Sequence, residues 1–321
     1  VNNGNSDITS KTEDKILELQ NLIEKHYMGD VKEKNLEDGV YKGYINGLND
    51  PYSVYYNKKE TKELYESTGG EYSGIGAVMS QNTETGVITL VQIYKDSPAE
   101  KAGLKENDIL YKVEGKEVTG KDLSKVVSKV KGEKGTTVEL TVLRGEDAKE
   151  VTVTATRDTV QAQTIEYKMM DDKIGYIRVS EFDTVTYDQY KEALDDLEKQ
   201  GMTGLVVDLR NNPGGSLSTV CDMLDLMLPK GLIVYTEDKN GKKTEMKSDE
   251  EHQFTKPLAV LVNGNSASAS EIYSGAIQDY GIGKIVGTQT YGKGVVQQIF
   301  DLDDGTAVKL TIAEYFTPKG R

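Results

Sequence analysis

The sequence has little histidine, little cysteine and no long apolar run, and each shortage excludes a class of protein. Its two histidines, His26 and His252, neither lie in a glycine-rich loop nor follow an apolar strand. A Ser/His/Asp triad is therefore disfavoured, as is a metal site built on paired histidines. The single cysteine, Cys221, cannot form an internal disulfide, and its apolar helical surroundings predict a buried, unreactive thiol.

Positive charge is also in deficit, because 39 Lys and Arg face 53 Asp and Glu and leave a formal net charge of −14. A field of this sign repels nucleic acid and anionic lipid, so neither is predicted as a partner. No segment approaches the roughly 18 apolar residues of a membrane span, and no signal-peptide pattern opens the chain. The polar opening, residues 1–11, is predicted to be flexible and could be the remnant of a tether.

Apolar spacing divides the 321 residues into three regions. From residue 12 to 68 the spacing predicts two amphipathic helices, near 16–27 and 36–48, and then a short charged helix near 61–66. From 69 to 160, runs of β-branched residues and two short helical segments make up one small domain. From 161 to 321, short apolar strands alternate with helices, which predicts a largely parallel sheet covered by helices. Ligand sites in such folds lie at the carboxyl ends of the strands.

Two apolar strands of the last region, predicted at 204–209 and 258–262, run into segments of small residues. The first segment is Asp-Leu-Arg-Asn-Asn-Pro-Gly-Gly, residues 208–215, and the second is Asn-Gly-Asn-Ser-Ala-Ser-Ala-Ser-Glu, residues 263–271. A helix follows each segment, so free backbone N–H groups converge where the strands end. Oxyanion holes are built in this way.

Ser268 has two interpretations. It lies three residues before Glu271, and this S-x-x-E spacing is typical of a helix capping box that contributes about 1 kcal/mol. A serine at the start of a helix, directly after a buried strand, is also where nucleophiles occur. On local grounds Ser266 and Ser270 are equally eligible.

With histidine nearly absent, the base for such a serine would be Lys293, which lies between Gly292 and Gly294. To accept a proton near neutral pH, this lysine needs a pKa about three units below its usual value of roughly 10.4, which corresponds to about 4 kcal/mol. Desolvation can supply that shift. Gln297 shares a face of the following extended segment with Lys293 and could orient the amine.

The segment 287–293 also matches most of a phosphate-binding loop. However, Gly294 stands where that motif requires Ser or Thr, and a strand-like segment follows where it requires a helix, so a nucleotide site is disfavoured.

Two glycines precede a predicted strand in the segment Tyr72–Met79. A dinucleotide fingerprint is incomplete here, because Met79 occupies the place of its third glycine. A plain hairpin loop explains the pattern. So does a nest of backbone N–H groups that captures the terminal carboxylate of a peptide beside a strand edge, with the helix predicted over 123–130 closing the groove.

Together these segments resemble the bacterial and organellar carboxyl-terminal processing proteases. Residues 266–272 look like the nucleophile motif of that family, residues 290–297 like its lysine motif, and residues 208–215 like its D-L-R-x-N-P-G-G element. Residues 47–53 and 97–103 extend the resemblance through a helical cap and a PDZ domain, so that it covers nearly the whole chain.

The resemblance implies an α/β fold with a ClpP/crotonase-like serine protease core over 161–321, an inserted PDZ domain over 69–160 and an N-terminal helical region over 12–68. It implies Ser268 as nucleophile, Lys293 as general base and Gln297 as the residue that assists them. The oxyanion hole would use the N–H of Ala269 and that of Gly215 or Gly214, with Gly215 preferred. The loop that binds the substrate carboxylate would consist of Gly74, Ile75, Gly76 and Ala77.

The resemblance further implies a serine endopeptidase that needs neither metal nor cofactor. It would act outside the cytoplasm, at the cell surface, in the periplasm or in an intermembrane space, anchored through an N-terminal segment. Its substrates would be proteins or peptides with free, apolar C-termini, and the full-length protein could form a homodimer. Two alternatives remain: a catalytically silent PDZ adaptor, which the intact Ser268, Lys293 and Gln297 disfavour, and an acyl-CoA enzyme on a related fold, which the PDZ-like region disfavours.

Overall fold

The structure is a computed structural model that describes residues 8–249 and 251–321. The chain forms two compact units, residues 1–55 and residues 56–321. The first unit contains α1 (Ile8–His26), α2 (Glu33–Asn46) and most of the short strand β1 (Val54–Tyr56), so both predicted N-terminal helices are present. Helix α1 begins at Ile8, inside the opening predicted to be flexible, and the remainder of that opening lies outside the described residues. None of the described helices combines the length and the apolar composition that a membrane crossing requires.

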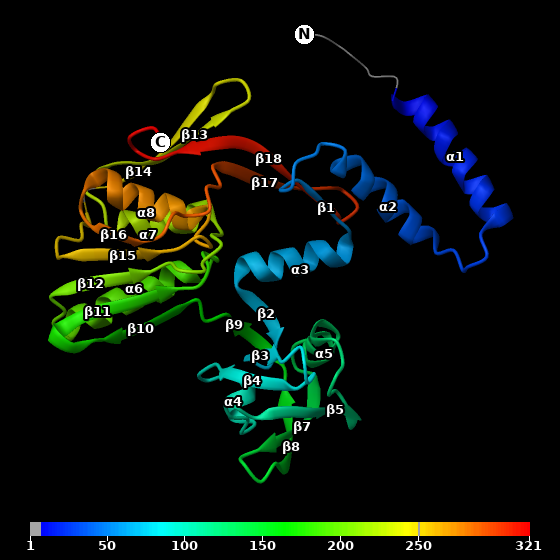
Figure 1. Ribbon diagram of the computed structural model, residues 1–321, viewed down its shortest axis with the longest axis horizontal. Helices are drawn as coiled ribbons and strands as arrows, with labels where there is room; N and C mark the ends of the chain where they lie inside the picture. Colours follow the sequence, from blue (N-terminus) through cyan, green and yellow to red (C-terminus); the bar gives the residue numbers. More distant parts are fainter. Residues whose placement is uncertain (1–7, 250) are drawn as a thin grey trace. The chain divides into compact units, whose positions relative to one another are not determined.

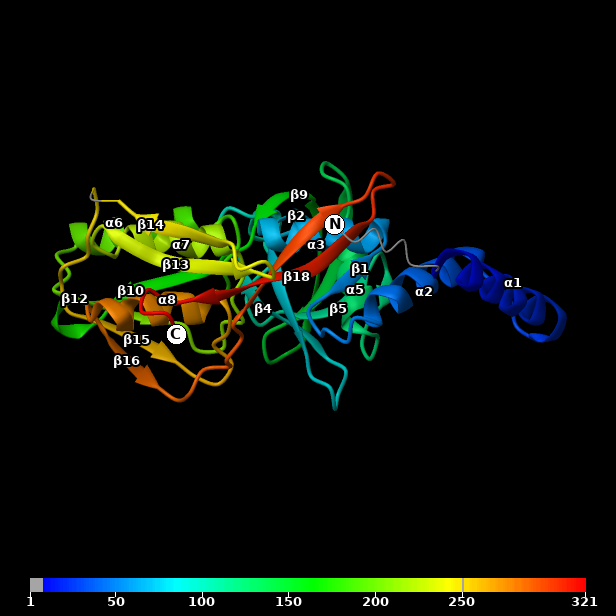
Figure 2. The ribbon, with the colours of Figure 1, turned by 90° about the horizontal axis from the view of Figure 1, so that it is seen from above.

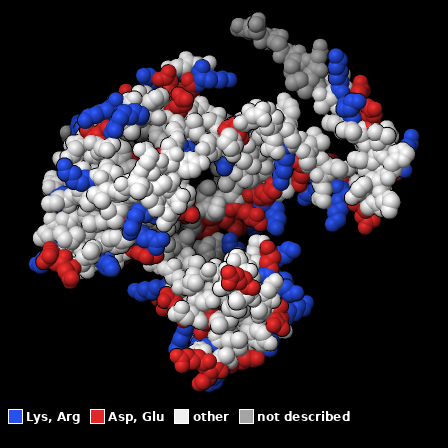
Figure 3. All heavy atoms as spheres, in the orientation of Figure 1, with Lys and Arg blue, Asp and Glu red and all other residues white. Residues whose placement is uncertain are grey.

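The second unit begins with α3 (Lys58–Gly69), a longer helix than the sequence predicts. Asn57 and Glu60 close a capping box at its start, through bonds of 3.0 and 2.9 Å, and Gly70 ends it in the left-handed conformation with φ 68°. A Cβ atom on Gly70 would lie 2.6 Å from Val185 Cγ2, so only glycine fits this position. Acidic side chains gather along this helix on the face drawn in Figure 3.

The PDZ-like region is inserted between two strands that pair with each other. Strands β2 (Glu71–Gly74) and β9 (Asp158–Gln161) are antiparallel, so the chain enters and leaves the region side by side. Between them lies the sheet of this region (Figure 1), and its strands have the order β3-β4-β5-β7-β8, with β6 beside β5. Its strands are β3 (Ala77–Gln81), β4 (Ile88–Ile93), β5 (Ile109–Val113), β6 (Lys116–Glu117), β7 (Thr137–Arg144) and β8 (Lys149–Thr156). The two predicted helical segments are α4 (Pro98–Lys101) and α5 (Leu123–Val130).

The remaining residues build two sheets with helices between them. The first sheet has the order β10-β11-β12-β15-β16, and all its pairs are parallel except β10 with β11, which confirms the largely parallel prediction. Its strands are β10 (Ile165–Met169), β11 (Ile174–Val179, preceded by the 3-10 turn Asp171–Lys173), β12 (Gly204–Asp208), β15 (Leu258–Val262) and β16 (Lys284–Gly287). Ile177, Val207 and Val260 form one fully buried row across it.

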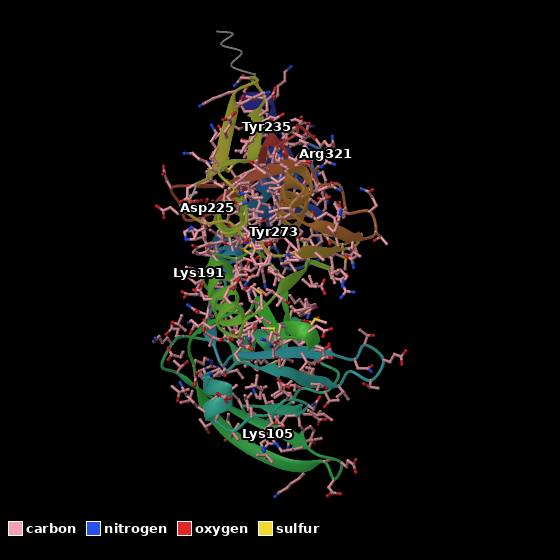
Figure 4. All side chains as sticks on the ribbon, turned by 90° about the vertical axis from the view of Figure 1, so that its left-hand side faces the viewer. Lys105, Lys191, Asp225, Tyr235, Tyr273 and Arg321 are labelled. Atoms are coloured by element: carbon pink, nitrogen blue, oxygen red, sulfur yellow. The ribbon has the colours of Figure 1, made fainter. Side chains whose placement is uncertain are left out.

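Three helices pack in the core with this row: α6 (Thr186–Lys199), α7 (Leu217–Asp225) and α8 (Ala269–Tyr280). Helices α7 and α8 are the two that the sequence predicts after the small-residue segments. The second sheet contains β13 (Gly231–Asp238), β14 (Lys243–Ser248), β17 (Val295–Asp301) and β18 (Ala307–Phe316), and α7 and α8 contact it as well (Figure 2). The interior includes Tyr273, labelled in Figure 4, and Cys221, whose thiol pKa burial raises to about 12. The predicted buried cysteine is confirmed.

Candidate active site

The two small-residue segments meet at the ends of β12 and β15, and the buried side chain of Asn212 joins them to β11. Its Nδ2 donates to the carbonyl of Val179 at 2.9 Å, and its Oδ1 accepts from the N–H of Gly214 at 2.8 Å. Its main-chain carbonyl accepts from the N–H of Ala267 at 3.1 Å and from Ser270 Oγ at 3.0 Å. This network fixes the glycine loop against the start of α8.

The structure distinguishes the three serines that the sequence left equivalent. Ser266 and Ser270 are 0% exposed, and their hydroxyls donate to the main-chain carbonyls of Leu209 and Asn212. Ser268 instead lines an open cleft and has φ 55° and ψ −114°, a backbone conformation that is strained for any residue with a side chain. A strained turn from strand to helix is how the nucleophile elbow of α/β-hydrolases presents its serine.

Gly214 packs directly against this turn, and Gly215 packs against the backbone of Phe182. A Cβ on Gly214 would lie 2.8 Å from Ser268 Cβ and 3.0 Å from the nitrogen of Ala269, and a Cβ on Gly215 would lie 2.4 Å from the carbonyl oxygen of Phe182. The Gly214 N–H is committed to Asn212, whereas the N–H groups of Gly215 and Ala269 donate to no residue that the structure describes.

The loop that carries Lys293 is tied to the Ser268 turn through Glu271. The carboxylate of Glu271 accepts the N–H of Ser268 at 2.8 Å, of Gly292 at 2.6 Å and of Lys293 at 2.9 Å. The sequence predicts the first of these bonds as half of a capping box. The other two arise only because the lysine loop folds back over the helix start.

Tyr315 supplies a second link between the same two residues. Its hydroxyl donates to the carbonyl oxygen of Lys293 at 2.5 Å and lies 3.3 Å from that of Ser268, and its N–H donates to the carbonyl of Gly294 at 3.0 Å. Burial, aided by the charge of Glu271, raises the pKa of this phenol, so it stays a donor throughout the working pH range. Nothing in the sequence marks Tyr315 beyond its place in the last strand.

These elements border one cleft of about 360 Å³. It brings together five of the six residues predicted for catalysis, namely Ser268, Ala269, Gly215, Lys293 and Gln297. Gln297 donates through Nε2 to Thr311 Oγ1 at 3.2 Å, which fixes its amide. Most of the remaining lining is apolar, and it includes Phe182, Leu217, Ile272, Val295 and Ile299.

The cleft also contains a carboxyl group that the sequence analysis missed. Asp183 lines the cleft and is 7% exposed, and burial, followed by the nearby charge of Glu181, raises its pKa to about 7. A carboxyl in a polar turn is ordinary in sequence, so only the tertiary structure shows that it is buried.

The predicted carboxylate loop joins β2 to β3 in the PDZ-like region. The N–H groups of Ile75 and Gly76 donate to no described residue, and Gly76 has φ 77°. A Cβ on Gly76 would lie 2.5 Å from the Cβ of Ser97, so the loop requires glycine there. Helix α5 contacts the adjoining strand β3, as the groove prediction requires.

Among the described residues, one group has the composition of a metal site. Ligand atoms of Asp225, Asp249 and His252 lie within 4.8 Å of one another at the surface. Asp225 already accepts the N–H of Asp249 at 2.7 Å, which explains the cluster as a loop contact.

Comparison with known proteins identifies relatives for each region. Residues 173–321 match peptidase family S41, residues 89–144 match a PDZ domain, and residues 2–61 match the N-terminal domain of the activating protease CtpB. The carboxy-terminal processing proteases CtpA and CtpB of Bacillus subtilis (strain 168) are 38% and 37% identical over 96% and 97% of this chain. The chain covers 66% and 65% of those two proteins, just under two thirds of their length. Among solved structures, the photosystem II D1 C-terminal processing protease is 28% identical with a TM-score of 0.52, covering 94% of this chain and 81% of that one.

Proposed function

Because this chain belongs to the carboxy-terminal processing proteases of peptidase family S41, we propose that it is a serine endopeptidase with Ser268 as nucleophile and Lys293 as general base. The observation that carries the proposal is the strained Ser268 turn, which shares one cleft with Lys293 and is joined to its loop by Glu271 and Tyr315. The family gives no support to the adaptor or to the acyl-CoA alternative.

In this proposal the neutral amine of Lys293 takes the proton of Ser268 Oγ as that oxygen attacks the scissile carbonyl carbon. The protonated lysine then gives the proton to the leaving amine, and water hydrolyses the acyl-enzyme by the reverse transfers. Gln297 assists by accepting a hydrogen bond from the amine. Its Nε2 is held by Thr311, which supports a role for its carbonyl oxygen as that acceptor.

The oxyanion would be stabilised by the N–H groups of Gly215 and Ala269. Gly214 is the weaker candidate, because its N–H already donates to Asn212 and would have to leave a buried acceptor. Two preorganised backbone donors beside the nucleophile are the arrangement that this chemistry requires, and losing one typically costs about 10²–10³ in kcat.

Substrates would be recognised through a free, apolar C-terminus bound to the PDZ domain. The N–H groups of Ile75 and Gly76, which donate to no residue in the described part of the chain, support carboxylate binding by residues 74–77, and the edge of β3 beside α5 supports addition of the tail as a strand. We also propose that the PDZ domain spans residues 69–160, between the helical region 12–68 and the protease core 161–321.

We also propose that the protein works outside the cytoplasm, anchored through an N-terminal segment, and that the full-length protein forms a homodimer. The first unit supports the dimer, because its two helices carry exposed apolar side chains, including Leu17, Leu19, Leu22 and Tyr44, and the segments after them add Met28 and Leu48.

Hydrolysis of casein, an unstructured protein, tests the catalytic assignment. Ser268→Ala and Lys293→Ala should each abolish turnover, while Lys284→Ala, which removes an exposed lysine from β16, should retain it. Undiminished activity in either active-site variant would end the Ser/Lys assignment. Amidation of a peptide substrate's C-terminus should raise KM, and an unchanged KM would refute recognition of the terminal carboxylate.

A further inference from the structure

Asp183 is the one carboxyl group in the lining of the catalytic cleft, and the proposed mechanism does not use it. The residue is more than nine-tenths buried, and its carboxylate, which solvent reaches only through the cleft, makes no hydrogen bond or ion pair with another described residue. Burial of an unpaired carboxyl costs free energy, and such groups in native structures call for an explanation.

The fold does not explain the carboxylate. Asp183 lies in the turn between β11 and α6, where aspartate side chains often cap the helix. Here the Asp183 carboxylate caps nothing, because α6 has no side-chain cap, and Asp183 instead donates its own N–H to Thr186 Oγ1 at 2.9 Å. On its other side Asp183 packs against Gly70. A Cβ atom on Gly70 would lie only 3.1 Å from the Cβ of Asp183, so the missing side chain leaves room for the aspartate.

The position of Asp183 relative to the reacting atoms is fixed by its neighbour Phe182. The N–H of Phe182 donates to the carbonyl of Gly214 at 2.9 Å, and the carbonyl of Phe182 accepts from the N–H of Ser216 at 2.7 Å. Phe182 is thus bonded on both sides of Gly215, the proposed oxyanion donor. Adjacent Cα atoms are about 3.8 Å apart, so the Asp183 carboxyl lies within a side chain's reach of the scissile bond.

The chemistry of the surroundings defines what would bind there. The other charged residues lining the cleft are Lys293 and Lys309. Glu181, in the same turn, adds a second negative charge nearby. An apolar substrate side chain would bury the carboxyl further without compensation, whereas a cationic one would offset its desolvation and satisfy its hydrogen bonds.

We propose that Asp183 is a specificity-determining residue of the cleft, whose carboxylate binds a Lys or Arg side chain of the substrate close to the scissile bond. This rests on the proposed protease function and adds to it a second selection, separate from recognition of the C-terminus.

The test uses a series of peptides with one common apolar C-terminal tail, in which a single residue near the cleavage site is either lysine or norleucine. Norleucine keeps the aliphatic stem and removes only the charge. At one position we expect kcat/KM for the lysine peptide to exceed that for the norleucine peptide by about 10-fold or more, the size of one charge-assisted hydrogen bond. In Asp183→Asn this ratio should fall to near one, while cleavage of the norleucine peptide persists.

The preference should also grow between pH 6 and pH 8, because ionisation of Asp183 strengthens it. The ionisation of Lys293 affects both peptides alike and cancels in the ratio. The proposal is overturned if no position favours lysine, or if Asp183→Asn retains the preference.

A binding measurement separates this inference from the catalytic one. Ser268→Ala should bind the lysine peptide more tightly than the norleucine peptide, and Ser268→Ala combined with Asp183→Asn should bind the two equally. If Ser268→Ala still cleaves, the proposed nucleophile is wrong whatever the selectivity. If Asp183→Asn does not fold, as judged by thermal unfolding, Asp183→Ser replaces it and the same two outcomes decide.

Discussion

Tyr315→Phe should separate catalysis from stability more cleanly than any other single substitution in the cleft. The change removes one hydroxyl and keeps the ring, which is 8% exposed and packs in the core. The hydroxyl donates to the carbonyl of Lys293 and lies near that of Ser268, so its loss frees the lysine loop from the Ser268 turn.

The expected magnitudes follow from that geometry. Loss of a buried hydrogen bond that leaves an acceptor unsatisfied costs about 1–3 kcal/mol, which lowers Tm by about 2–6 °C in a unit of this size. A displacement of the base by about 1 Å can cost 100-fold in rate, so we expect kcat to fall about 10–100-fold. KM should change little, because the apolar walls of the cleft and the peptide groove remain intact.

Tyr280→Phe is the matched control. Its hydroxyl donates to the carbonyl of Leu232 at 2.9 Å, at the far end of α8 from Ser268. Both variants are assayed for thermal unfolding and for kcat and KM on one peptide. The control should lose similar stability and keep its kcat. If Tyr315→Phe keeps kcat within twofold of wild type, or if the two variants lose activity equally, the phenol does not position the base.

Three further predictions concern other parts of the chain. Gly215→Ala should reduce kcat at least 100-fold, because its Cβ would lie 2.4 Å from the carbonyl oxygen of Phe182 and would displace the proposed oxyanion donor. Gly39→Ala is the control, since nothing lies within 4 Å of a Cβ at that position, and it should keep its kcat. An active Gly215→Ala enzyme would contradict the assignment. Asp183 should make the free energy of unfolding fall as pH rises from about 4 to above 7, because its pKa is about 7 in the folded state against its usual 3.8, and the folded state holds the proton over that window. In urea titrations Asp183→Asn should flatten this part of the curve. An unchanged slope would refute the burial argument. Sedimentation of the full-length protein should show a dimer that Leu17→Asp and Leu22→Asp weaken, whereas a wild-type monomer at every concentration would exclude the proposed interface.

The predictable part of this protein is the part in which local sequence and fold agree. The α/β protease core with a PDZ domain is confirmed, and the strands predicted at 204–209 and 258–262 appear within one residue of their expected limits. These strands could be predicted because a buried strand requires a run of apolar residues, and the tight turn that follows it requires glycine. The paired strands β2 and β9 escaped prediction because each has four residues and little apolar content, and each is a strand only through the other.

The contacts that the sequence analysis missed have a common physical origin. Asp183, Glu271 and Tyr315 act through neighbours that tertiary folding brings to them. Tyr315 lies 47 residues from Ser268, and the carboxylate of Glu271 reaches backbone N–H groups 21 and 22 residues away. An S-x-x-E spacing predicts a cap and contains no information about a loop that returns to the same carboxylate. Such bonds are visible only once the chain is folded.

Glu271→Gln tests whether that shared carboxylate acts through geometry or through charge. The substitution keeps one acceptor oxygen for three N–H donors, so the lysine loop should loosen and the maximal kcat should fall about 10-fold or more. It also removes a negative charge beside the Lys293 backbone, and a cation that loses a neighbouring anion gives up its proton more easily. The acid limb of the kcat/KM profile should therefore move to lower pH while the plateau drops. A lower plateau with an unmoved acid limb would show that Glu271 acts by geometry alone, and an unmoved plateau would show that the three bonds do not hold the base in place.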